Sequence, residues 1–155
     1  MPPALVAAAL GLALAYAPPK ARLPAAVVFV VAASIAARLT IDPSHIEIVF
    51  IACWTCVVVD SASVHLRGGI GARLALGLAL ISGILAGAVV ALSGSPRDLL
   101  IALPCMAIVV LAGWLVATGR GIIVKIVSSW LIAIAILSAA LPLTPTPGYA
   151  PDHME

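Results

Sequence analysis

The fold is decided by the stretch RLALGLALISGILAGAVVALSGS, residues 73–95. Between Leu74 and Ser93 this stretch contains no charged residue. At a rise of about 1.5 Å per residue, a helix of that length crosses a hydrocarbon core of about 30 Å. The stretch therefore predicts a transmembrane α-helix, and the segments around it have to be interpreted as parts of a membrane protein.

Small residues recur at every fourth position along this helix. A spacing of four keeps them on one slowly turning face. Because lipid is as apolar as leucine, membrane helices associate where small side chains let their backbones approach closely. We therefore predict that this face packs against another helix, either in the same chain or in a second copy or partner. Its residues are Ala75, Ala79, Gly83, Gly87 and Ala91.

The composition of the whole chain agrees with a membrane protein. Of its 155 residues, 64% are hydrophobic and 9% are charged, whereas a soluble domain has about 25% charged residues. The mean hydropathy is +1.26. The net charge of +2 is too small to suggest a nucleic-acid-binding surface. The three cysteines all lie in apolar runs, which argues against a secreted fold held by disulfides.

Six apolar segments predict one all-α domain over residues 1–141, a polytopic integral membrane helical bundle. The first segment, residues 4–17, has no basic residues before its apolar core, so we expect a retained helix rather than a signal peptide. The tail, residues 142–155, contains four prolines and is predicted to be extended. The other predicted helices cover residues 23–39, 45–64, 74–93, 99–118 and 122–141.

The basic residues alternate along the chain with the period of the predicted spans. They are concentrated in the first, third and fifth connections, which the positive-inside rule places on the cytoplasmic side. With six spans, both termini are then predicted to lie on the outer, periplasmic side of a bacterial-type inner membrane. The residues concerned are Lys20 and Arg22, Arg67 and Arg73, and Arg120 and Lys125.

A C-x-x-C pair in the third predicted helix places Cys53 and Cys56 on one helical face. Cys105, beside Met106, is expected at a similar depth in the fifth helix, and His45 at the outer mouth. Thiolates and thioethers select soft metal ions such as Cu(I), so the set is a candidate for soft-metal binding or for thiol–disulfide exchange. Buried cysteines more often only pack. We favour packing and expect no cofactor.

Asp60 follows Cys56 by four residues in the same predicted helix. A carboxylate inside a span is a functional candidate by default. Because Asp60 lies about one turn from the inner boundary, close to His65 and Arg67, an interfacial ion pair or helix-end contact is favoured. No charged residue is then expected near the middle of a span, which argues against ion-coupled transport.

The sequence shows no Ser–His–Asp arrangement, phosphate-binding loop or opposed pair of carboxylates, so no enzyme is expected. The leading hypothesis is a membrane protein that assembles through its small-residue faces, with itself or with other membrane proteins. It would act as a pore, a holin-like lesion or a scaffold subunit of a larger complex. One alternative is the thiol-redox or copper-type protein, and another is passive permeation of a small solute. The expected partners are the lipid bilayer and membrane proteins, not nucleic acid.

Overall fold

The computed structural model describes residues 2–93 and 104–141. Over these ranges the chain forms six α-helices, one 3-10 turn and no β-strand, so the predicted all-α class is confirmed. The predicted tail and the first residues of the predicted fifth helix lie outside the described residues. The helices are α1 (Pro2–Leu14), α2 (Pro19–Ala36), α3 (Ile46–Ser63), α4 (Ala72–Ser93), α6 (Ile108–Ala117) and α7 (Gly121–Ala140), and the turn η1 (Pro43–His45) precedes α3.

Four of these helices are long and apolar enough to cross a membrane, as in a multi-pass membrane protein: α2, α3 extended by η1, α4 and α7. The other two, α1 and α6, are apolar but have only 13 and 10 residues. At about 1.5 Å per residue they measure roughly 20 and 15 Å, less than a hydrocarbon core of about 30 Å. Pro18 and Pro19 follow the end of α1 closely, and Pro19 begins α2, where a missing N–H costs little.

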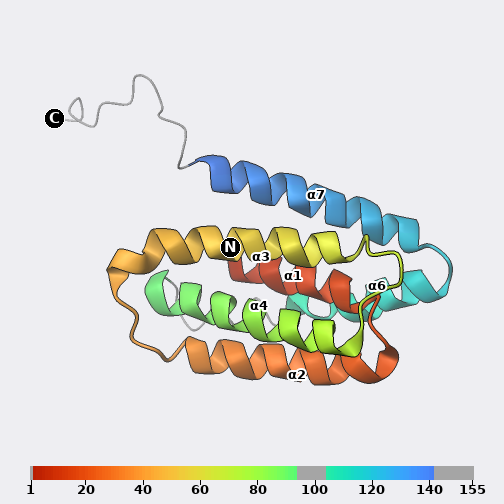
Figure 1. Cartoon of the computed structure of the whole chain (residues 1–155), viewed down its shortest axis with the longest axis horizontal. Coiled ribbons are helices and arrows are strands. Elements are labelled where there is room, and N and C mark those ends of the chain that lie inside the picture. The colour runs from red at the N-terminus through yellow and green to blue at the C-terminus, as the bar shows by residue number, and fades with distance from the viewer. Residues whose placement is uncertain (1, 94–103, 142–155) are drawn as a thin grey trace.

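The long helices lie side by side in the order α2, α4, α3, α7, and α1 lies behind α3 and α4 in the view of Figure 1. The most extensive contact is between α2 and α4, and α1 contacts α3, α4, α6 and α7. The short α1 is therefore the centre of the bundle. Its buried apolar side chains are Val6, Ala7, Ala9, Leu10, Leu12, Ala13 and Leu14. By contrast α7 leaves much apolar surface exposed, as a lipid-facing helix does.

The predicted small-residue face of α4 packs inside one chain. A Cβ atom on Gly83 would lie 2.6 Å from the carbonyl oxygen of Phe29. One on Gly87 would meet the carbonyl oxygen of Ala33 and lie 2.7 Å from the Cβ of Ala36. Two glycines thus let the backbones of α2 and α4 come together. In the same predicted face, Ala75 and Ala79 are buried and Ala91 is half-buried.

Three connections meet at one end of the bundle: α1–α2, α3–α4 and α6–α7 (Figure 1). Tyr16 links them, because its hydroxyl donates to the carbonyl oxygen of Gly121 (2.9 Å) and its own carbonyl oxygen accepts from the N–H of Ile70 (3.2 Å). Gly69 has φ 74°, and a Cβ there would lie 2.9 Å from the carbonyl oxygen of Tyr16, so the turn requires glycine. Six of the eight Lys and Arg residues belong to these connections or lie within about two turns of them, as the alternation predicts: Lys20, Arg22, Arg67, Arg73, Arg120 and Lys125.

Candidate functional site: a buried polar cluster between α3 and α4

Asp60 lies in the last turns of α3 and is 0% exposed. The Cα–Cβ bond of a helical residue tilts toward the N-terminus of its helix, which for α3 is the end remote from the basic connections. The carboxyl group therefore reaches into the bundle. There Ser82, halfway along α4, donates a hydrogen bond of 2.7 Å to Oδ2. Within the described residues Asp60 makes no ion pair with His65 or Arg67, whose side chains are exposed. The helix-end contact is made by its backbone instead, because the carbonyl oxygen of Asp60 accepts a hydrogen bond from the hydroxyl of Ser63 (2.6 Å).

Cys56, one helical turn before Asp60, completes the site. Its Sγ lies 3.1 Å from the Oγ of Ser82 and 3.9 Å from Oδ2 of Asp60. The hydroxyl hydrogen of Ser82 is engaged by Asp60, so the single thiol hydrogen of Cys56 faces two acceptors, the Oγ of Ser82 and Oδ2 of Asp60. The Cys56–Asp60–Ser82 cluster is thus a short hydrogen-bond chain from thiol to hydroxyl to carboxylate, and all three side chains are buried.

Asp60 is only half satisfied. Its Oδ1 is buried, as is the hydroxyl of the neighbouring Ser61, and neither has a hydrogen-bond partner among the described residues. The bonds to Asp60 that the described structure contains come from neutral side chains, not from a Lys, Arg or His. A buried carboxylate oxygen without a donor is costly. Oδ1 is therefore the oxygen of the cluster that lacks a partner among the described residues.

The other predicted site residues are dispersed. Cys53 is buried in α3, Cys105 is half-buried just before α6, and Met106 is buried. His45 is exposed at η1, where its Nδ1 lies 3.2 Å from the Oγ of Ser44. Within residues 2–93 and 104–141, no three His, Cys, Asp or Glu side chains come together as a metal-ligand set. The C-x-x-C pair and Cys105 therefore gain no support as a metal site.

The residue that sequence reasoning missed is Ser82. An isolated hydroxyl in an apolar helix usually bonds the carbonyl one turn back in its own helix. Thr55, Ser128 and Ser129 do so, each donating to the carbonyl oxygen four residues earlier at 2.8–2.9 Å. Nothing local in the sequence separates Ser82 from these three. Only the packing of α3 on α4 turns its hydroxyl toward Asp60.

Comparison with known proteins adds no relative, because no family model, curated protein or solved structure matches this chain. The geometry of the Cys56–Asp60–Ser82 cluster therefore carries the functional argument by itself.

Proposed function

We propose that this chain is a non-enzymatic, multi-pass protein of a bacterial-type inner membrane that binds and releases a single positive charge at Asp60. The charge is a proton or a small monovalent cation. The observation that supports this proposal is the complete burial of Asp60, whose Oδ1 lacks a partner among the described residues and whose Oδ2 has only neutral partners there.

Charge compensation supports this proposal. Removing a carboxylate from water costs several kcal/mol unless a positive charge accompanies it. Acidic groups inside membrane bundles for this reason mark ion paths and proton relays. Asp60 has no ion pair within the described part of the chain, so none of the described residues supplies the compensating charge, and a bound proton or cation would supply it.

The depth of the carboxyl group in the bundle also supports it. By residue count Asp60 is only about one turn inside α3, but its carboxyl group reaches Ser82 at the midpoint of α4. Ion-coupled transport is disfavoured from the sequence because no charged side chain is expected near the middle of a span. The position of the Asp60 carboxyl group removes this reason. A membrane-embedded carboxyl with one hydroxyl donor is the kind of group that ion-coupled proteins use.

The hypothesis of assembly through small-residue faces stays a prediction, but the surface that motivated it is occupied. Gly83 and Gly87 face α2 of the same chain, so a pore, holin-like lesion or scaffold would need another surface. Native mass spectrometry in mild detergent measures the stoichiometry directly. A defined oligomer would support assembly through the lipid-facing sides of α7 or α2.

The thiol-redox alternative requires two thiols that exchange with a partner. Cys53 and Cys56 are both buried, and Cys56 is engaged with Ser82. This arrangement favours a role for the Cys56 thiol as a neutral hydrogen-bond donor within the cluster.

The proposal is tested by ion flux in proteoliposomes. The purified protein is reconstituted with a pH-sensitive dye inside the vesicles, and a potassium diffusion potential is imposed with valinomycin. A second arm uses a sodium-sensitive dye and a sodium gradient. We expect the wild-type protein to admit protons or sodium, and the arm that responds identifies the charge. Asp60→Asn keeps the shape of the side chain but carries no charge. With this variant the ion flux is expected to fall to that of protein-free vesicles.

Asp42→Asn is the matched control. Asp42 is an exposed carboxylate at η1, and the hydrogen bond from the backbone N–H of Ser44 (2.9 Å) lowers its pKa. Loss of the Asp42 charge should leave the ion flux unchanged. The proposal is overturned if Asp60→Asn conducts like the wild-type protein, or if the wild-type protein admits neither ion in either arm. Size-exclusion chromatography before reconstitution establishes that each variant is folded.

A further inference from the structure

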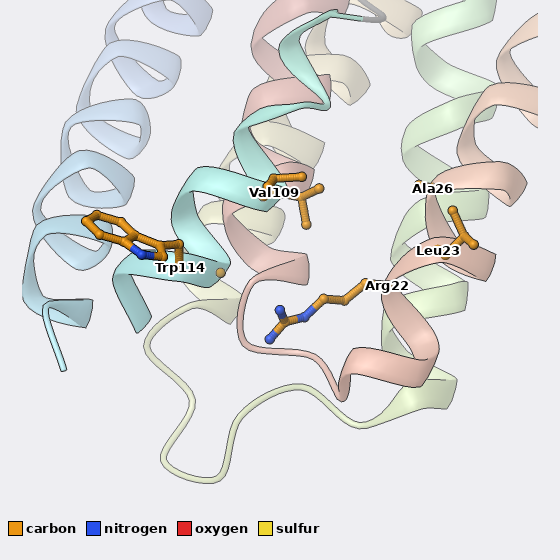
Figure 2. Close-up of a pocket in the computed structure, with 7 residues that line it drawn as sticks. Arg22, Leu23, Ala26, Val109 and Trp114 are labelled. Atoms are coloured by element: carbon orange, nitrogen blue, oxygen red, sulfur yellow. The ribbon is translucent and has the colours of Figure 1, made fainter. Parts of the chain in front are cut away.

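A second feature lies at the basic end of the bundle, in the groove between α2 and α6. Its cavity volume is about 440 Å³, and Arg22 lies at one end of it. In Figure 2 the side chain of Arg22 extends from the start of α2 toward α6, with Val109 and Trp114 on the far side of the groove. The apolar lining consists of Leu23, Ala26, Val109, Val110, Gly113 and Trp114.

The guanidinium of Arg22 is fixed in place by the end of α1. Its Nε donates to the carbonyl oxygen of Ala17 (3.1 Å) and its Nη2 to that of Ala15 (2.8 Å). The remaining nitrogen, Nη1, lies toward α6, where a Cβ atom on Gly113 would be 2.8 Å from it. The glycine thus leaves the space in which Nη1 lies.

Arg22 retains unused donors that face the groove. A guanidinium has five N–H groups, and the described residues accept from Nε and Nη2 only. No acidic side chain pairs with Arg22 within the described ranges. A half-buried cation whose remaining N–H groups have no acceptor among the described residues is suited to binding an anion, and arginine presents a fork that matches phosphate oxygens.

The surroundings say which anion fits. The same end of the bundle carries Lys20, Arg67, Arg73, Arg120 and Lys125, and clustered cations beside a bilayer attract anionic headgroups. The rest of the groove is apolar and open at the side of the bundle, where an acyl chain would lie. Trp114, 53% exposed, is of the residue type that favours the headgroup level.

We propose that the groove between α2 and α6 is a binding site for an anionic phospholipid. The phosphate accepts from Nη1 of Arg22, and the upper part of one acyl chain lies along Leu23, Ala26 and Val110. The site is distinct from the Cys56–Asp60–Ser82 cluster and does not depend on the function proposed for it.

Quenching of Trp114 by brominated lipid tests the site. In the double variant Trp54→Phe, Trp130→Phe, Trp114 is the only tryptophan. The protein in mild detergent is titrated with phosphatidylglycerol or phosphatidylcholine, each brominated on the acyl chain. We expect saturable quenching with a midpoint about tenfold lower for phosphatidylglycerol, because the phosphate of phosphatidylcholine is already compensated by its own choline ammonium and interacts less strongly with Arg22.

Arg22→Gln in the same background should abolish this preference, whereas Lys20→Gln, which removes an exposed charge at the same end, should shift the midpoint less than about threefold because that charge is screened. Since Arg22 also holds the end of α1, Val110→Phe is a second variant: it narrows the groove, leaves Arg22 in place and should weaken both lipids. Equal midpoints for the two lipids in the wild-type background, or an unchanged preference in Arg22→Gln, would overturn the proposal.

Discussion

At the scale of single residues, the absence of a side chain at two glycines of α4 sets the distance between α2 and α4. Gly83 and Gly87 lie against backbone atoms of α2, and backbone cannot move aside as a flexible side chain can. Gly77, on the same helix α4, has no atom within 4 Å of the position that a Cβ would take. The two kinds of glycine look alike in the sequence but differ in what surrounds them.

We predict that Gly87→Ala destabilises the protein by about 1–3 kcal/mol, because the added methyl group forces two packed backbones apart. Gly77→Ala is the matched control and should be neutral or stabilise by up to about 1 kcal/mol through helix propensity. Unfolding in mixed micelles of increasing SDS fraction, followed by tryptophan fluorescence, measures both. Equal midpoints for the two variants would contradict the close approach of α2 and α4.

Ser82→Ala should cost about 1–3 kcal/mol, because it leaves Oδ2 of Asp60 buried without its hydroxyl donor. Ser129→Ala serves as the control: that hydroxyl is exposed and bonds only its own helix, so its removal should change the stability by less than about 0.5 kcal/mol. The same SDS titration compares them. A Ser82→Ala variant as stable as Ser129→Ala would show that the hydrogen bond to Asp60 contributes nothing.

At the scale of elements, α1 is the core of the bundle although it is too short to cross a membrane. Its buried position depends on two contacts near its C-terminal end. Toward its C-terminal end Tyr16 bonds the α3–α4 connection and the first residue of α7. Farther toward its N-terminus, Gly11 lies against the start of α6, where a Cβ would meet Ile108.

Tyr16→Phe should loosen α7 without disturbing α1, since the ring remains and only the bond to the carbonyl oxygen of Gly121 is lost. The expected cost is about 0.5–1.5 kcal/mol. Hydrogen exchange with mass spectrometry should show faster exchange in the first turn of α7. Thr118→Val, which removes a hydroxyl that bonds only within α6 and its end, should leave that turn unchanged. Identical exchange in the two variants would refute a role of Tyr16 in holding α7.

Much of this element scale follows from the sequence, and its failures have physical causes. Long apolar runs predict α2, α3, α4 and α7, because hydropathy is a property of each segment by itself. Hydropathy does not predict that α1 and α6 are short. Their lengths depend on the proline pair at residues 18–19 and on the turn before Ile108. Asp60 was recognised as a candidate but placed at the interface, because residue counting ignores the direction of its side chain. Its partner Ser82 lies on another helix, and only tertiary packing reveals it.

At the scale of the whole molecule, the charge distribution is polarised along the bundle. The α1–α2, α3–α4 and α6–α7 connections lie together at the basic end. The α2–α3 connection, which contains Asp42, lies at the other end (Figure 1). This arrangement favours an orientation with the basic end in the cytoplasm, which stays a prediction along with the outward location of both termini.

Cysteine labelling tests that orientation. In a background with Cys53→Ala, Cys56→Ser and Cys105→Ala, single cysteines are placed at the exposed positions Leu66 and Ser44. With a membrane-impermeant maleimide on intact cells, we expect Ser44→Cys to react and Leu66→Cys to react only after permeabilisation. The reverse pattern would invert the topology, and labelling of both from one side would contradict the separation of the two ends.

The central position of α1 has a consequence for how the protein is made. The helices that α1 contacts, α3, α4, α6 and α7, all follow it in the chain and are synthesised after it. A segment of roughly 20 Å leaving the translocon alone leaves part of a bilayer of about 30 Å unspanned. It therefore cannot reach its final position until the later helices have entered the membrane. The last step of membrane assembly is thus the enclosure of α1, a helix that is synthesised before all of the helices that surround it.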